Sequence, residues 1–273
     1  MLVPSNAQLP VPASVVNIAL TSTDHEIAHW IFWISSVIVA VGVIYALQDW
    51  RKNKSVVPLL LIIGGAAANL SEPFVDIVAG CWHPAAGQHT LFELMGRPMP
   101  VWLFPTYIAS FGVQAMVMYV AFRRGISARA MWLWYLVPVM SDIVLEVCLL
   151  NLSDNLYVYY GNQPLVLAGF PLFWAPINAL GVYVPVVVLT LLSPHMKGWK
   201  LATVPLFTPL LYAAVMGLTG MPSIVVINTA APSWMVPLGG LASTALALTV
   251  VFLCVRMLAD GSRYNLRQLL RPA

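Results

Sequence analysis

The chain has 273 residues, of which 60% are hydrophobic and only 8% are charged. Soluble domains carry about 25% charged residues, so this composition excludes an ordinary soluble protein. The net charge of +3 does not indicate a nucleic-acid partner, because the basic residues lie between long apolar runs, where they set membrane orientation.

Apolar runs long enough to cross the hydrocarbon core, which takes about 20 helical residues, recur along the chain. Backbone amides in lipid must be hydrogen-bonded within their own segment, so these runs are predicted to be helices. The expected spans are residues 26–47, 56–78, 99–122, 130–150, 170–192, 202–221 and 235–258, which leave no room for a soluble domain. The sequence T-D-H-E at 23–26 is typical of a capping box that begins the first helix. In the sixth span, Gly217, Gly220 and Pro222 are expected to break up the end.

Basic residues follow every second span. They lie after spans one, three, five and seven, as Arg51, Lys52, Lys54, Arg123, Arg124, Arg129, Lys197, Lys200, Arg256, Arg263, Arg267 and Arg271, and only Arg97 falls on the other side. Lysine and arginine mark the cytoplasmic side. We therefore expect an all-α membrane protein, a bundle of seven transmembrane helices with its N-terminus outside and its C-terminus in the cytoplasm. No basic segment precedes the first span, so no cleaved signal peptide is expected. In a bacterium the location would be the plasma membrane.

Small residues and prolines predict where the helices meet and where they bend. Gly64 and Gly65 in span two, and Gly239 and Gly240 in span seven, suit close helix packing. Pro73 follows Glu72, and Pro138 lies one turn before Asp142. A proline frees a carbonyl and kinks a helix, which lipid tolerates only beside protein or a wet cavity. These kinks therefore indicate a cavity near the acids.

Four carboxylates fall inside the predicted spans: Glu72 and Asp76 in span two, Asp142 and Glu146 in span four. Each pair has i, i+4 spacing and so shares one helix face. A charged carboxylate in the membrane costs about 2.5–3.5 kcal/mol, so the four together indicate a polar interior. Both spans run outward, which puts all four in the outer half of the bilayer. We predict that they are catalytic; the alternative is that they hold helices together by hydrogen bonds.

Further polar and aromatic residues on the same side are candidate substrate-binding groups: Asn69, His83, Glu93, Arg97, Tyr157, Tyr159, Trp174 and Asn178. The outer arginine either forms a salt bridge with Glu93 or fixes a charged acid or oxyanion. The two tyrosines either belong to an interfacial aromatic belt or roof a cavity. Trp174 and Asn178 lie one turn apart and suit a pocket wall.

Histidines and cysteines leave two alternatives open. His25 and His29, at i, i+4, share a helix face and with Glu72 or Asp76 offer metal ligands, although the spacing is not that of the H-E-x-x-H zinc-protease motif. Cys81 and Cys148 are both expected near the outer face, where a disulfide between them is conceivable. No lysine lies within a span, which excludes a retinal Schiff base, and no Walker-type loop, GxSxG elbow or DDxxD-like motif is present.

Four stretches carry a family resemblance: E-P-F-V-D at 72–76, G-x-P-x-P-x-W at 96–102, S-D-I-V-L-E at 141–146 and Y-V-Y-Y-G-N-Q-P-L at 157–165. In their order of acids, aromatics and small residues they resemble the AveC-like integral membrane proteins, a family named for spirocyclases of polyketide biosynthesis. The resemblance runs from span two to span five and implies ring closure of a lipophilic natural product. No catalytic residue is carried over from it. Small membrane terpene cyclases of the fungal meroterpenoid type are similar in size and also have acids within their helices.

These observations favour a cofactor-independent membrane cyclase or isomerase that acts on a lipophilic natural product, of spiroketal or terpenoid type, by acid–base catalysis. Paired carboxyls in different surroundings can divide into acid and base at neutral pH. A proton-coupled transporter and a metal-dependent membrane oxidoreductase using His25 and His29 are the alternatives. The inverted repeat typical of many transporters is not detectable. The expected partners are the lipophilic substrate and membrane lipid, with the oligomeric state open.

Overall fold

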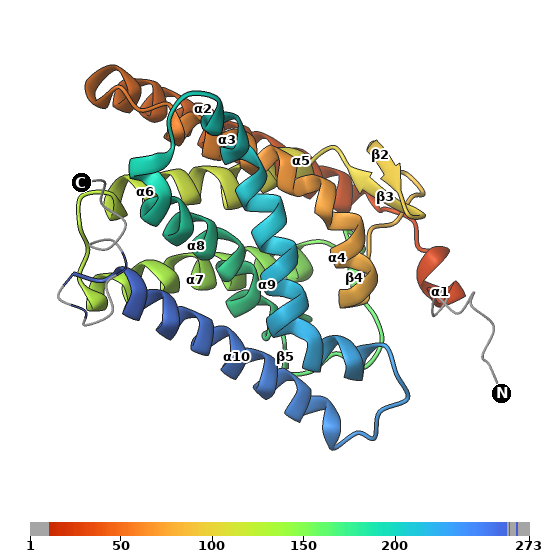
Figure 1. Ribbon diagram of the computed structural model, residues 1–273. Helices are drawn as coiled ribbons and strands as arrows, with labels where there is room; N and C mark the ends of the chain where they lie inside the picture. Colours follow the sequence, from red (N-terminus) through yellow and green to blue (C-terminus); the bar gives the residue numbers. More distant parts are fainter. Residues whose placement is uncertain (1–10, 261, 263–265, 267–273) are drawn as a thin grey trace.

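The computed structural model describes residues 11–260, 262 and 266 of the chain. Within them, seven helical segments are long and apolar enough to cross a membrane (Figure 1). Their outer surfaces are apolar too, as the exposure of Trp33 and Val41 on one helix and of Leu241 and Phe252 on another illustrates. Such a surface needs lipid as its solvent. The chain is thus an all-α, multi-pass integral membrane protein that contacts lipid.

The long helical segments are α2 (Ser22–Asn53), α3 (Val57–Ala68) continuing into α4 (Glu72–Ala79), α5 (Leu103–Tyr107) continuing through the π-helix η2 (Ile108–Val113) into α6 (Gln114–Phe122), α7 (Ala128–Leu152), α8 (Trp174–Leu192), α9 (Val204–Ile227) and α10 (Met235–Leu258). The short helical elements are α1 (Ala13–Val16), η1 (Asn69–Ser71), η3 (Ser193–His195) and η4 (Gly198–Thr203). Three antiparallel strand pairs complete the described part: β1 (Cys81–Trp82) with β4 (Val158–Tyr159), β2 (Thr90–Leu94) with β3 (Arg97–Pro100), and β5 (Val166–Leu167) with β6 (Phe170–Pro171).

The two ends of the bundle differ in chemistry. All three strand pairs belong to the connections at the end where α2 begins, here called the strand end (Figure 1). The described basic residues that the sequence assigned to one side lie at or near the opposite end, where Arg123, directly after α6, forms an ion pair with the buried Asp49 of α2. The predicted segregation of charge is present, while the side of the membrane that each end faces stays a prediction.

The first helix starts earlier than expected, because its capping box lies at Thr21 and Asp24 and not at residues 23–26. The Thr21 backbone N–H donates to Asp24 Oδ2 (2.8 Å), and the Asp24 N–H donates to Thr21 Oγ1 (3.3 Å). Asp24 is also fully buried, and its Oδ1 accepts from the backbone N–H groups of Asp154 and Asn155, both at 2.8 Å. A contact with the end of α7 thus selects this cap over the nearby alternative.

Two spans begin later than their hydropathy suggests. Met99 lies in β3 and Phe170 in β6, so the helices that follow start at Leu103 and Trp174. Both strands are buried, and a buried strand is as apolar as a helix. The spans predicted from hydropathy therefore began too early, because each included a buried strand. The last span, α10, has the expected bounds.

The sixth span does not break at Pro222 but continues to Ile227. Proline disrupts the hydrogen bonds of its own helix, and here a neighbouring helix supplies a replacement. The Ser223 N–H donates to Ser243 Oγ of α10 (3.1 Å), and the Ser243 hydroxyl also lies 3.4 Å from the Gly220 carbonyl oxygen. Interhelical hydroxyls of this kind let membrane helices tolerate proline.

The second and third spans are distorted where they meet. Pro73 has neither an N–H nor room for the carbonyl four residues before it, and the chain tightens into the 3₁₀ turn η1 at that point. In the next span, η2 is widened to a π-helix. Gly65 and Gly112 let the two cross closely, since a Cβ on Gly65 would lie 2.5 Å from the Gly112 nitrogen. This crossing fixes the walls of the cavities described next.

Candidate active site

All four predicted acids line one small cavity toward the strand end of the bundle. Its volume is about 80 Å³, with Glu72 and Asp76 contributed by α4 and Asp142 and Glu146 by α7. The i, i+4 spacing turns both members of each pair to the same helix face, and the break at η1 lies directly before Glu72. Five aromatic side chains also line it: Tyr107, Phe111, Tyr159, Trp174 and Tyr212.

Three of the acids accept hydrogen bonds from neutral groups. The Tyr107 hydroxyl donates to Glu72. Asn178 Nδ2 donates to Asp142 Oδ2 (3.2 Å), and Asn178 Oδ1 in turn accepts from the Tyr212 hydroxyl (2.9 Å). No cation is paired with Glu72 or Asp142 in the described part of the chain. Their negative charge would therefore rest on neutral donors alone.

Glu146 accepts from two phenols at a single oxygen. The hydroxyls of Tyr157 and Tyr159 donate to Glu146 Oε2 at 2.8 and 3.2 Å. Burial raises the pKa of both phenols well above the ordinary value, and the charge of Glu146 raises it further. Both hydroxyls therefore stay protonated and act as donors. Of the two readings of the tyrosine loop, the structure favours a cavity roof over a surface belt.

Asp76 differs from the other three acids because its partner is a histidine, a side chain that can carry a positive charge. His83 Nδ1 lies 3.1 Å from Asp76 Oδ2, and both side chains are buried. The His83 ring packs against both Trp102 and Tyr157, whose ring centroids lie 5.9 and 5.6 Å from it and 6.2 Å from each other. Cys81 also lines the cavity, and burial, aided by the charges of Asp76 and Glu72, raises the pKa of its thiol well above the usual range. The thiol is therefore a poor nucleophile as it stands.

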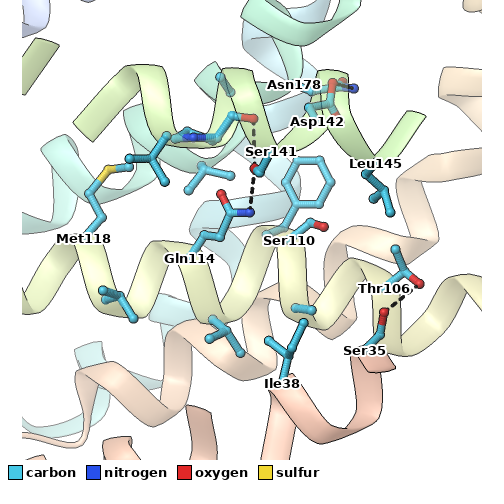
Figure 2. A pocket seen from close by; sticks show the side chains of 18 of the residues that line it. Ser35, Ile38, Thr106, Ser110, Gln114, Met118, Ser141, Asp142, Leu145 and Asn178 are labelled. Carbon is cyan, nitrogen blue, oxygen red and sulfur yellow. Dashed lines mark hydrogen bonds between the residues drawn. The ribbon is translucent and has the colours of Figure 1, made fainter. Parts of the chain in front are cut away.

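A second, larger cavity of about 360 Å³ adjoins the first (Figure 2). The two share six lining residues: Thr106, Ser110, Phe111, Asp142, Leu145 and Asn178. The remaining lining is mostly aliphatic and aromatic, crossed by a hydrogen bond from Gln114 Nε2 to Ser141 Oγ (3.0 Å; Figure 2).

This larger cavity reaches the outside of the bundle between α2 and α7. Ile34 and Ile38 of α2 and Val137 of α7 line it, and all three are exposed on the outer surface. That surface faces lipid, so the larger cavity opens toward the membrane and has one of the acids, Asp142, in its wall.

Five of the eight predicted substrate-binding residues line neither cavity. His83 and Tyr157 still contact acids of the small cavity, whereas Arg97, Glu93 and Asn69 do not. Arg97 donates to the Cys81 carbonyl oxygen (3.0 Å) and to the Tyr160 hydroxyl (2.7 Å), with its guanidinium 5.0 Å from the Trp82 ring centre. It thus joins strand-end loops and contacts neither an acid nor Glu93, which is exposed on β2. Asn69 is buried in η1 and lines neither cavity.

Two alternatives from the sequence do not fit the structure. His25 and His29 are exposed on α2 and form no metal-type cluster with the acids among the described residues. Cys81 is buried, Cys148 is exposed, and both are free thiols, so they form no disulfide.

Sequence reasoning missed Tyr107 and Tyr212, which reach the acids from α5 and α9. A signal existed, because a tyrosine hydroxyl deep in an apolar span needs a hydrogen-bond partner. Ser110 and Thr106 gave no such signal, since a helical hydroxyl can bond to its own backbone.

No protein-family model, curated protein or solved structure matches this chain. Its function must therefore be inferred from the geometry of the two cavities.

Proposed function

We propose that this chain is a membrane cyclase or isomerase that acts on a lipophilic substrate by acid–base catalysis in the acid-lined cavity. The observation that carries the proposal is that four carboxylates from two helices line a cavity of about 80 Å³ which shares a wall with an apolar cavity open toward lipid. The acids provide the chemistry, and the apolar cavity admits the substrate.

The carboxyls supply complementary roles. In a small cavity several neighbouring carboxylates repel one another, so one is readily a proton donor while another is charged. Glu146, with two phenol donors on one oxygen, suits the carboxylate that stabilises a cation and takes up a proton. Glu72 and Asp142, each with a single neutral donor, suit the acid.

Formation of a spiroketal from a dihydroxyketone illustrates the reaction class. One hydroxyl adds to the ketone to give a hemiketal. A protonated carboxyl then gives its proton to the hemiketal hydroxyl, the C–O bond breaks, and water and an oxocarbenium ion form. The second hydroxyl attacks the cation and loses its proton to a carboxylate. The aromatic lining limits access of bulk water to the cation.

The resemblance to AveC-like proteins and the charge pattern extend this proposal. The first favours a ring-forming reaction on a natural product. The second, through the positive-inside rule, puts the strand end and the acid cavity near the outer face, in the plasma membrane if the source is bacterial.

The test is conversion of long-chain dihydroxyketones in membranes that contain the full chain, followed by mass spectrometry for loss of water. General acid–base groups contribute about 10²–10⁴-fold to rate, so we expect losses of at least about 100-fold in Glu72→Gln, Asp142→Asn and Glu146→Gln. Glu93→Gln is the matched control, because this acid is exposed and lies outside the cavity. Full turnover in the three cavity variants would contradict the proposal. Movement of unchanged compound across proteoliposomes, driven by a pH gradient, would replace it with transport.

A further inference from the structure

Three buried side chains beside the acid cavity are grouped like the ligands of a metal ion. Asp76, Cys81 and His83 each offer one ligand atom, and these atoms lie within 4.8 Å of one another. No other group of this kind occurs in the part of the chain that the structure describes. It is also distinct from the histidine pair His25 and His29.

The local chain path explains why the three meet. α4 ends at Ala79, and Gly80 has a φ of 64°, which turns the chain back into β1. A Cβ at Gly80 would also lie 2.6 Å from the Tyr160 carbonyl oxygen. Both the positive φ and the lack of space therefore require glycine at this position. In an extended segment alternate residues share a face. Cys81 and His83 are therefore presented on one side, about one helical turn beyond Asp76.

The spacing and the hydrogen bonding of the three groups both suit a bound cation. His83 Nδ1 and Asp76 Oδ2 lie 3.1 Å apart. Two such ligands on one tetrahedral zinc, each about 2.0–2.1 Å from it, lie about 3.3 Å apart. The other oxygen, Asp76 Oδ1, accepts no hydrogen bond from the residues that the structure describes, although Asp76 is only 1% exposed. A buried carboxylate oxygen without a donor is costly, and a bound cation removes that cost.

We propose that Asp76, Cys81 and His83 bind a divalent transition-metal ion of the zinc class, with the fourth coordination position directed to the acid cavity. Asp76 and Cys81 both line that cavity, while the His83 ring is fixed by Trp102 and Tyr157. A carboxylate, a thiolate and a neutral imidazole together balance a 2+ charge, which suits a buried site. Thiolate and imidazole ligands select zinc-like ions over magnesium and calcium.

Metal binding goes beyond the proposed reaction and is measured without a substrate. The full chain, purified in detergent and treated with chelator, is titrated with Co²⁺. We expect one cobalt ion per chain, a thiolate-to-cobalt charge-transfer absorption, and displacement of the cobalt by Zn²⁺. The absorption should disappear in Cys81→Ser, and affinity should fall at least about 10-fold in His83→Gln. Cys254→Ser, at another buried thiol, is the matched control and should keep both.

The outcomes separate this site from the proposed catalysis. Glu146→Gln should bind cobalt like the wild type even where it loses turnover. Failure of the wild-type chain to bind cobalt overturns the inference whether or not the variants fold. So does a thiolate absorption that persists in Cys81→Ser.

Discussion

Replacing Gly65 by alanine tests the crossing that shapes both cavities. An added Cβ would lie 2.5 Å from the Gly112 nitrogen and 2.6 Å from its Cα. Both are backbone atoms, so no side chain can turn aside and the two helices must separate. Overpacking costs about 1–3 kcal/mol, and a backbone clash belongs at the upper end. Gly217→Ala in α9 is the matched control, because nothing lies within 4 Å of its added Cβ.

Comparing the two variants removes the gain in helix propensity, which both share. The expected difference in the free energy of unfolding is therefore about 3 kcal/mol, and at about 2–4 °C per kcal/mol for a chain of this size it corresponds to roughly 6–12 °C in Tm. The assay is thermal unfolding of both purified variants in one detergent, followed by circular dichroism. Because η2 also carries Ser110 and Phe111 of the cavity wall, Gly65→Ala should lower turnover as well. If the two variants melt at the same temperature, the close crossing does not exist.

Two further predictions concern the packing of α9 and the state of the thiols. Ser243→Ala removes the acceptor of the buried Ser223 N–H and should lower the free energy of unfolding, measured by thermal unfolding, by about 1–3 kcal/mol. The control is Thr249→Ala, at an exposed hydroxyl that bonds to its own helix, which should change it by less than about 0.5 kcal/mol. Equal effects of the two variants would refute the account of Pro222. In native, metal-free protein at neutral pH, a maleimide should spare the buried Cys81 and should label it once the chain is unfolded in denaturant, because burial raises the Cys81 pKa and the thiolate is the reactive form. Mass spectrometry that finds Cys81 labelled as fast in the native chain as in the unfolded chain would contradict this.

The seven helical spans were predictable because membrane insertion depends on a sum over local residues. Each apolar run carries its own signal, and each helix satisfies its backbone within itself. The span boundaries were less predictable. Met99 and Phe170 are as apolar as the residues of the helices that follow them, but each lies in a strand that pairs with another loop strand. Pro222 does not end its helix, because a serine from another helix accepts the Ser223 N–H.

The candidate site shows the same division. The spacing of Glu72 with Asp76 and of Asp142 with Glu146 predicted shared helix faces, and the structure brings both pairs to one cavity. Arg97 has equally distinctive chemistry in the sequence, yet it binds a loop carbonyl. A residue type indicates what a side chain can bind, while the path of distant segments decides what it meets.

The sequence by itself determined that the protein lies in lipid, how many spans it has, and which acids share a helix face. All three follow from hydropathy and helical periodicity within single stretches of the chain. Only the tertiary structure decided that the apolar cavity adjoins the acids, that two phenols from the loop after α7 reach Glu146, and that Cys81 and His83 close around Asp76. The cavities join segments far apart in the chain. The two phenols lie 11 and 13 residues from Glu146 and reach it because the loop after α7 folds back, and the third arrangement depends on a reversal at Gly80 that packs against Tyr160. No local pattern encodes such distances, because they are fixed by packing between helices and loops.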